Sequence, residues 1–258
     1  MNYLNIDTTK RFPHLPRAPI VEAVIHWQAP PAKQLEPDKL QEKLGETFDN
    51  YAMQPQVNQE LGVSGNPGSI EVKQRTNWEG VRLNSPKEDQ AKFVCQFLKT
   101  GVVFSQLAPY QGWTQFVQEA KRFWEKYVQL AEPTSVSPLS VRYISQIPVH
   151  SSVDVGNCIH EVCAPLSGLE LGADHFFHQD SIQLTNQPYK INVIRAVQPA
   201  TDRSANLIVD ISVSTTSVLE NLSVLDDKLE ELRFIKNEVF FTLMKDAETK
   251  FGAVNGNH

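Results

Sequence analysis

The sequence predicts an α+β protein made of two related halves, each an antiparallel sheet packed on helices. One order of elements, strand, helix, three strands and helix, can be traced twice along the 258 residues. Each set of three strands runs without the crossover helices that parallel pairing needs. An amphipathic helical pattern then closes each half. These observations exclude a doubly wound parallel sheet and favour a saddle-like arrangement with one sheet face free or lining a groove.

A short segment rich in proline and serine divides the chain. Residues 132–138 contain two prolines and two serines, and this composition marks connections between structural units. We therefore predict an N-terminal extension at 1–17, a first half at 18–132, a linker at 133–137, a second half at 138–252 and a disordered tail at 253–258.

In the first half we expect a strand at residues 19–28, followed by a helix that begins near Pro37 and has apolar residues at helical spacing up to Tyr51. Residues 61–69 are rich in Gly, Asn and Pro, which predicts a loop. Three strands are expected at residues 80–84, 92–99 and 102–107, with a tight turn before the last. The aromatic face of a long closing helix comprises Phe116, Ala120, Phe123, Trp124, Tyr127 and Ala131.

In the second half we expect a strand at residues 139–148 and a short helix at 155–166. Strands at 175–184, 189–197 and 206–213 follow. Ser223 has the residue type of a helix N-cap, with acidic residues in the following turn. Gly252 is placed to end that helix. The buried stripe is expected at Leu225, Leu229, Leu232, Ile235, Val239 and Leu243, with Phe234, Phe240, Phe241 and Met244 widening it.

Composition limits the classes of function. The chain is 41% hydrophobic and 21% charged, with a net charge of −6, so nucleic acid is not expected as the main ligand, because phosphate binding relies on Lys and Arg. No apolar run reaches the roughly 20 residues of a membrane span, and no signal-peptide pattern is present, which predicts a cytoplasmic protein without membrane association. Three cysteines without a close pair predict free thiols.

Three motifs resemble those of a known group of proteins. They are Phe-Pro-His-Leu followed by Ala-Pro-Ile-Val-Glu-Ala-Val-Ile within residues 12–25, Pro-Tyr-Gln-Gly-Trp at 109–113, and Arg-Tyr-Ile-Ser-Gln-Ile at 142–147. Together they resemble a sporadically distributed bacterial family of proteins of similar length that has no assigned activity. Ala108-Pro109 and Ser145-Gln146 depart from the family pattern. The resemblance implies an accessory gene of the kind found near antiviral defence or toxin–antitoxin loci.

Metal ligation and cofactor chemistry have little support in the sequence. His175 and His178, flanked by acidic residues, are the main metal-ligating types in one cluster, but positions i and i+3 of a strand face opposite sides. Cys158, His160 and Cys163 form a second set, which a helix would spread around its axis. No phosphate-binding loop, nucleotide-binding glycine pattern or nucleophile elbow is present. We expect neither a metal nor a cofactor.

Several polar and aromatic residues still mark a candidate surface. Glu22 lies in an apolar strand and needs a partner if buried, and Arg142 lies at a similar offset in the second half, so we predict a Glu22–Arg142 ion pair. Tyr110 and Trp113 precede the first long helix and either anchor it on the core or line a ligand surface. The residues we expect at a ligand or partner surface are His14, Glu22, Tyr110, Trp113, Arg142, Tyr143 and Phe241.

Two classes of function remain open. The first is a non-catalytic binding protein, a partner or regulatory subunit with a protein partner or a second copy of itself. The second is an enzyme or small-ligand sensor that uses the groove between the halves, with Glu22, His14, His175 or His178 as acid–base groups. A pocket in which those side chains converge would favour the enzyme, and a filled core with an exposed apolar patch would favour the partner protein.

Overall fold

The computed structural model describes residues 4–66, 69–86, 88–149, 152–160, 176–199 and 205–253. Within these ranges the centre of the molecule is a nine-stranded sheet with the strand order β2-β3-β4-β5-β1-β6-β9-β8-β7. All neighbouring strands pair antiparallel. The α+β class is therefore confirmed, with antiparallel pairing in place of parallel crossovers.

The strands from the two parts of the chain lie on opposite sides of the centre of this sheet. The elements before residue 132 are β1 (Ile20–Gln28), α1 (Pro37–Gly45), β2 (Ala52–Asn66), β3 (Ser69–Asn84), β4 (Lys92–Leu98), β5 (Gly101–Leu107) and α2 (Trp113–Ala131). The later elements are β6 (Leu139–Val149), α3 (Ser152–Cys158), β7 (Phe177–Gln183), β8 (Tyr189–Pro199), β9 (Ala205–Thr215), a 3₁₀ turn (Leu222–Val224), α4 (Leu225–Leu243) and α5 (Ala247–Phe251).

Strands β1 and β6 join the two parts. They pair antiparallel from Ile20 opposite Ser145 to Trp27 opposite Leu139, with an irregularity after Ile20. Strand β5 pairs with the other edge of β1, and β9 with the other edge of β6. The two parts thus share one continuous sheet, and side chains of β1 and β6 lie at its centre.

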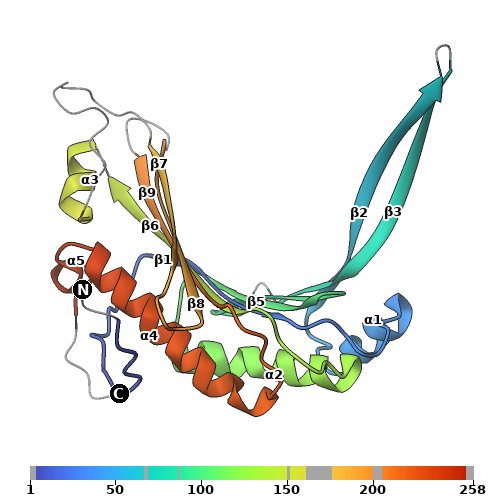
Figure 1. The fold of residues 1–258 in the computed structure, drawn as a ribbon, viewed down its shortest axis with the longest axis horizontal. Helices are drawn as coiled ribbons and strands as arrows, with labels where there is room; N and C mark the ends of the chain where they lie inside the picture. The colour runs from blue at the N-terminus through green and yellow to red at the C-terminus, as the bar shows by residue number, and fades with distance from the viewer. Residues whose placement is uncertain are drawn as a thin grey trace.

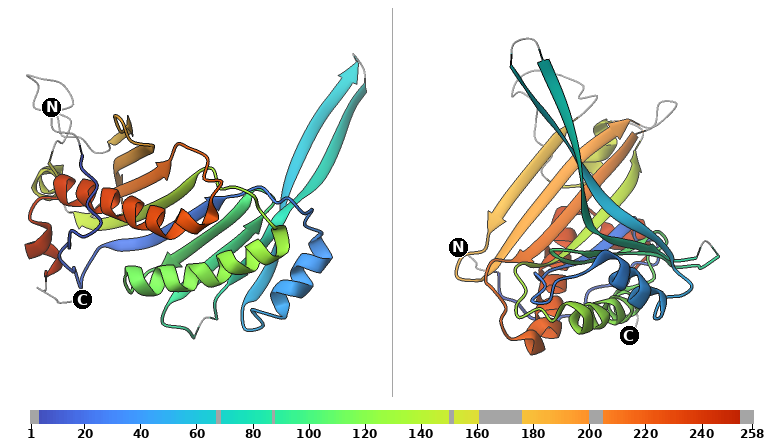
Figure 2. Two further views of the ribbon diagram at one scale, coloured as in Figure 1. Left: turned by 60° about the horizontal axis from the view of Figure 1, so that its bottom comes forward. Right: turned by 90° about the vertical axis from the view of Figure 1, so that its right-hand side faces the viewer.

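The two faces of the sheet differ because the helices α1, α2 and α4 pack on one of them. Figures 1 and 2 show the two long helices on the same side of the curved sheet, whose other face is concave. Residues of β1 alternate accordingly: Ala23, Ile25 and Trp27 are buried, and the residues between them are half-buried. The outer part of the β2–β3 hairpin projects away from the rest of the molecule (Figure 1).

Aromatic side chains fill the layer between the sheet and the helices. Phe48 stacks on Phe123 of α2 with ring centroids 4.2 Å apart, and Phe104 of β5 contacts the same ring at 5.2 Å. Trp27 of β1 stacks on Trp124 at 5.4 Å. The aromatic face expected for the first long helix is therefore confirmed as its buried face.

The predicted loop at residues 61–69 is wrong. Leu61 to Asn66 belong to β2, and Ser69 begins β3, so that the hairpin pairs from Ala52 opposite Asn84 to Asn66 opposite Ser69. Glycine and asparagine indicated a turn, but the paired backbone amides of the neighbouring strand hold this stretch extended. Residues 67 and 68 lie outside the described ranges.

The limits of three predicted helices also differ. The short helix expected at residues 155–166 is α3, at Ser152–Cys158, and residues 161–166 lie outside the described ranges. Helix α1 ends at Gly45, and Phe48 and Tyr51 are buried beyond its end, because core packing rather than helical periodicity positions them. Ser223 is not an N-cap: it lies in the 3₁₀ turn before α4, and its backbone amide donates to the Asn221 side chain. Gly252, in the left-handed region at φ 70°, ends the separate helix α5.

The predicted linker is packed against the sheet. Val136 is fully buried, and its backbone pairs with Leu219 in both directions. The amide of Ser137 donates to the carbonyl oxygen of Gln28 over 2.7 Å. Of the predicted tail, Ala253 is described and residues 254–258 lie outside the described ranges.

Candidate functional site

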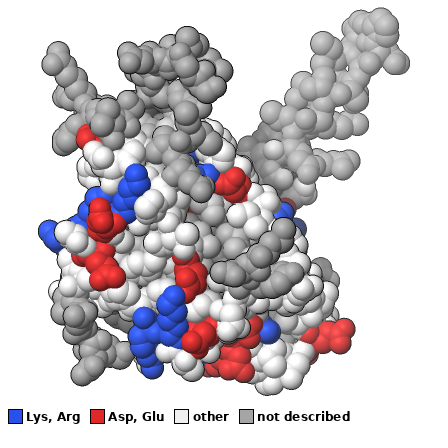
Figure 3. Space-filling view, turned by 60° about the vertical axis from the view of Figure 1, so that its left-hand side comes forward, with Lys and Arg blue, Asp and Glu red and all other residues white. Residues whose placement is uncertain are grey.

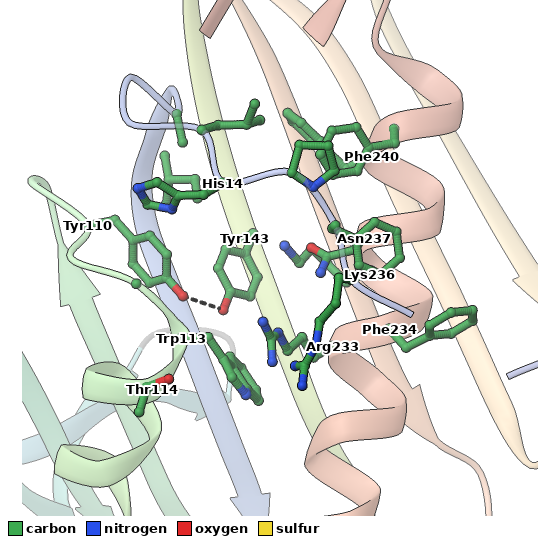
Figure 4. A pocket seen from close by; sticks show the side chains of 18 of the residues that line it. His14, Tyr110, Trp113, Thr114, Tyr143, Arg233, Phe234, Lys236, Asn237 and Phe240 are labelled. Atoms are coloured by element: carbon green, nitrogen blue, oxygen red, sulfur yellow. Dashed lines mark hydrogen bonds between the residues drawn. The ribbon is translucent and has the colours of Figure 1, made fainter. Parts of the chain in front are cut away.

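A pocket opens on the helix-covered face of the sheet, between α2 and α4. Its floor comes from Tyr143 and Ser145 of β6 and Ile211 of β9, its sides from the first turns of α2 and from α4, and its remaining wall from the segment before β1. The volume is about 820 Å³, within the usual range for small-ligand sites. Because both parts of the chain contribute, we call it the inter-half pocket. Figure 4 shows side chains from these elements pointing into it.

Two tyrosines form a hydrogen-bonded pair in the pocket. The hydroxyl oxygens of Tyr110, in the loop before α2, and Tyr143, on β6, are 3.0 Å apart (Figure 4). Burial raises the pKa of Tyr110 to about 12 and holds the pKa of Tyr143 well above its usual value. Both phenols therefore stay protonated at neutral pH. One hydroxyl donates to the other, so the accepting hydroxyl keeps its own proton for a third partner.

A second cluster links α2 to α4 at the side of the pocket. The Trp113 indole N–H donates to Glu230 Oε1 over 2.5 Å, and Arg233 Nη1 donates to Glu230 Oε2 over 3.1 Å. The Arg233 guanidinium lies over the Trp113 ring, 5.5 Å from its centroid. Among the described lining residues, Glu230 is the one carboxylate, and it accepts from both of these donors. Its charge balances that of Arg233, three residues further along α4.

Lys236 differs from Arg233 in having no carboxylate partner among the described residues. Its ammonium lies over the Tyr143 ring, 4.0 Å from the centroid, a distance suited to a cation–π contact. Lys236 is half-buried and lines the pocket. Burial, reinforced by the charge of Arg233, lowers the pKa of Lys236 to about 7.

The segment before β1 covers the pocket from the outside. Phe12 stacks on Phe241 with ring centroids 5.6 Å apart and meets Phe234 at 5.8 Å. Lys10 forms an ion pair with Glu238 of α4. His14 lies exposed on the same segment and lines the pocket at its rim. The apolar second side of α4 is therefore covered by the protein's own N-terminal segment.

The structure brings together five of the seven residues that the sequence singled out. His14, Tyr110, Trp113, Tyr143 and Phe241 all line the inter-half pocket. The sequence did not identify Lys236, Arg233 or Glu230. A signal for Lys236 was present, because it lies four residues after Leu232 and four before Phe240, both buried, and so interrupts an apolar face of α4.

Glu22 and Arg142 lie on the opposite, uncovered face of the sheet. Glu22 pairs in register with Ile144, whose neighbour Tyr143 faces the pocket, and residues alternate between faces along a strand. These two residues therefore belong to a different surface from the other five.

The predicted Glu22–Arg142 ion pair is wrong, because the bidentate partner of Arg142 is Asp210. Arg142 Nε lies 2.9 Å from Asp210 Oδ1, and Arg142 Nη2 lies 2.5 Å from Asp210 Oδ2. Asp210 on β9 and Glu22 on β1 both pair with Ile144, so they lie on either side of β6, each diagonal to Arg142. The side chain of Asp210 is only 8% exposed, so its carboxylate depends on a partner more than the half-buried Glu22 does.

The candidate metal ligands are not brought together in the described part of the chain. His178 lies on the edge strand β7, where it hydrogen-bonds to Asp180 over 3.0 Å, and Asp180 also pairs with Arg195. His175 and Cys163 lie outside the described ranges, and Cys158 is buried in α3. Among the described residues, no group of three His, Cys, Asp or Glu side chains is arranged to hold a metal ion.

Comparisons with known proteins add no assignment to this geometry. No family model, no curated protein and no solved structure matches the chain. The resemblance to a sporadically distributed bacterial family therefore stays a prediction. None of the helices in the described ranges combines the length and the apolar content needed to cross a membrane. On the face drawn in Figure 3, acidic and basic side chains lie interspersed.

Proposed function

We propose that the protein is a non-catalytic binding protein that holds a small ligand in the inter-half pocket. The observation that carries this proposal is the pocket itself, with a volume of about 820 Å³, aromatic walls and a few converging polar groups. Pockets of this size and lining are typical of small-molecule sites. Because α2 comes from one part of the chain and α4 from the other, a ligand here contacts both.

The placement of the acid–base candidates supports binding over catalysis. Glu22 lies across the sheet from the pocket, and His178 lies on the outer strand β7. His14 reaches the rim, but the one carboxylate that lines the pocket, Glu230, already accepts bonds from Trp113 and Arg233. The one imidazole–carboxylate pair named above, His178 with Asp180, lies outside the pocket. Among the described residues that line the pocket, the acid–base candidates named from sequence therefore do not converge, as general acid–base catalysis requires.

A protein partner is the second candidate function, favoured by the uncovered concave face of the sheet. Polar residues of β1, β6 and β9 lie on it, and Phe177 on the edge strand β7 is 68% exposed. A partner protein or a second copy of the chain would use this face rather than the pocket. A cytoplasmic location and a role in a defence-like or toxin–antitoxin-like system remain predictions from sequence.

We infer further that the two halves are a duplicated unit. In support, the order β1-β5-β4-β3 on one side of the centre corresponds to β6-β9-β8-β7 on the other. A short helix follows β1 and β6, and a long helix follows β5 and β9. If this proposal holds, the inter-half pocket lies at the junction of two copies of one unit, with the N-terminal segment as an addition to the first.

A pocket-filling variant tests the proposed binding function. Asn237 lines the pocket beside Lys236 (Figure 4), so Asn237→Trp introduces an indole into the ligand space. Thr242→Trp, on an exposed position of the same helix outside the pocket, is the matched control. We expect ligand-observed NMR with a mixed library of neutral, cationic and anionic aromatic fragments to detect binding to the wild type and to Thr242→Trp, and loss of it in Asn237→Trp. Absence of binders, or binders unaffected by Asn237→Trp, would contradict the proposal.

A further inference from the structure

We infer that the ligand of the inter-half pocket is an organic carboxylate with a flat aromatic body, whose carboxylate pairs with Lys236. This inference rests on the proposed binding function and names the chemical class of the ligand. It is carried by the charge of the pocket lining, by the environment of Lys236 and by the shape of the aromatic walls.

The pocket has a charge opposite to that of the protein. The chain carries a net charge of −6, yet among the described residues the charged side chains that line the pocket are four cations, Lys10, Arg11, Arg233 and Lys236, and one carboxylate, Glu230. The first turn of α2 also lines the pocket and contains no acidic residue, so its amide groups add positive potential. A cationic pocket in an acidic protein favours an anionic ligand over neutral and cationic ones.

Within this set, Lys236 is the cation that needs a ligand. Lys10 pairs with Glu238, Arg233 pairs with Glu230, and Arg11 is exposed to solvent. Lys236 has only the Tyr143 ring as a partner among the described residues. An ammonium withdrawn from water without a carboxylate is unfavourable. One uncompensated cation is matched by a monoanion such as a carboxylate, whereas a phosphate dianion would need further donors.

The walls around Lys236 indicate the rest of the ligand. Trp113, Phe12, Phe234 and Phe241 lie around the pocket, and Tyr110 and Tyr143 present one hydroxyl proton that is not used between them. Flat rings stack on such walls in offset or edge-to-face geometry. An aromatic carboxylate satisfies both features, because its ring meets the walls while its charge meets the ammonium.

Proton uptake on binding tests whether Lys236 is the group that pairs with the ligand's carboxylate. The charged and titratable groups around it are Arg233 and Glu230 on α4, Tyr143 on β6, Tyr110 in the loop before α2, and His14, Lys10 and Arg11 in the N-terminal segment. Because the pKa of Lys236 is lowered to about 7, this ammonium loses its proton as the pH rises through neutrality in the free protein. A bound carboxylate favours the protonated form. Binding should therefore take up more proton at pH 8 than at pH 6.

The test uses isothermal titration calorimetry with 2-naphthoate and its neutral counterpart 2-naphthamide, in buffers with different heats of ionisation. We expect the wild type to bind 2-naphthoate at least about tenfold more tightly than 2-naphthamide, as a charge-assisted contact provides. Lys236→Met should abolish this preference and the proton uptake while 2-naphthamide binding remains. Lys236→Arg should keep the preference for the anion without proton uptake, because a guanidinium does not titrate in this range.

Controls separate the possible failures. His14→Asn is the control for the histidine at the pocket rim, since histidine is a common source of pH dependence near neutrality. This variant should leave the proton uptake unchanged, because the uptake is assigned to Lys236. If 2-naphthamide and other neutral fragments bind as tightly as 2-naphthoate, or if proton uptake persists in Lys236→Met, the carboxylate assignment is overturned while the proposed binding function stands. If neither probe binds and Asn237→Trp alters no fragment binding, the proposed function fails together with the ligand class.

Discussion

The two faces of the central sheet balance the charge of a cation in different ways: Arg142 lies half exposed on one face, and Lys236 lies half-buried on the other. On the uncovered face, Arg142 is bonded to Asp210 by two nitrogens, and this pairing raises the pKa of its guanidinium. On the helix-covered face, one residue away along β6, Tyr143 supports Lys236, and burial lowers the pKa of that ammonium to about 7. On the open face, Asp210 of the sheet itself provides the counter-charge for Arg142. On the covered face, no carboxylate of the described residues does so for Lys236.

This difference follows from what covers each face. The open face keeps contact with water, so its ion pair completes the sheet surface and needs no further group. The covered face is lined by aromatic rings of α2, α4 and the N-terminal segment, and among the described residues Lys236 has no carboxylate partner there. This difference supports our proposal that the pocket, rather than the open face, binds the ligand.

The largest expected effect comes from placing a charge in the covered layer. Leu232 of α4 is fully buried, so Leu232→Asp should lower the free energy of unfolding by about 4 kcal/mol, the cost of burying an unpaired carboxylate. The same charge on the open face, as Gln146→Asp at an exposed position of β6, should cost less than about 1 kcal/mol. Urea denaturation followed by circular dichroism measures both. Similar losses in the two variants would break the comparison between the faces.

The ion pair of the open face gives the second effect. Arg142→Met leaves the Asp210 carboxylate buried without its bidentate partner and should cost about 2 kcal/mol in urea denaturation. Glu22→Gln should cost less than about 0.5 kcal/mol, since Glu22 is not the partner of Arg142. Adding Asp210→Asn to Arg142→Met should recover part of the loss, because a neutral amide is less costly to bury. A larger loss in Glu22→Gln than in Arg142→Met would reinstate the ion pair predicted from sequence.

Much of the fold could be predicted because hydrophobic periodicity and turn residues act locally. The strand at β1 and the aromatic face of α2 follow from spacing along the chain. The tight turn predicted at Thr100-Gly101 lies one residue earlier, at Lys99-Thr100, because Gly101 already pairs with Leu98 as the first residue of β5. The outer part of the β2–β3 hairpin could not be predicted in this way. Its strands are held together by backbone hydrogen bonds, and residues 61–69 show no alternation of apolar side chains that would indicate a strand.

The site was predicted only in part for the same reason. Aromatic and histidine motifs singled out Tyr110, Trp113 and His14 one by one, but their convergence depends on the register of β1 with β6 and on the docking of α4. Lys236 resembles a solvent-facing lysine unless the burial of its helical neighbours is known. Arg142 was paired with Glu22 because strand position alone does not show which neighbouring strand carries the more buried carboxylate.

The third prediction concerns the cover of the pocket. Phe12→Ala removes the ring that stacks on Phe241 and meets Phe234, and should cost about 1.5 kcal/mol or less, because Phe12 is half-buried. The loss should be local, and limited trypsin digestion should cut faster after Arg11 and Arg17 while the rest of the chain stays resistant. Phe241→Asp should act alike and remain monomeric in size-exclusion chromatography. Unchanged digestion in both variants would contradict the assigned cover.

The smallest expected effect is a difference between Lys236 and Arg142 in how their contribution to stability depends on pH. The folded-state pKa of Lys236 is lowered to about 7 from the ordinary value of about 10.5, so between these values the unfolded chain binds more protons than the folded one. The contribution of Lys236 to the free energy of unfolding therefore rises with pH. Relative to Lys236→Met, the wild type should gain about 1 kcal/mol in free energy of unfolding between pH 6.5 and 8.

The loss caused by Arg142→Met should stay constant over this range, since the Arg142 pKa is raised rather than lowered. Saturating 2-naphthoate should remove the pH-dependent gain, because a bound carboxylate keeps Lys236 protonated. Urea titrations at the two pH values measure these differences, and a stability difference between wild type and Lys236→Met that is constant or falls with pH would show that the covered face does not desolvate this ammonium.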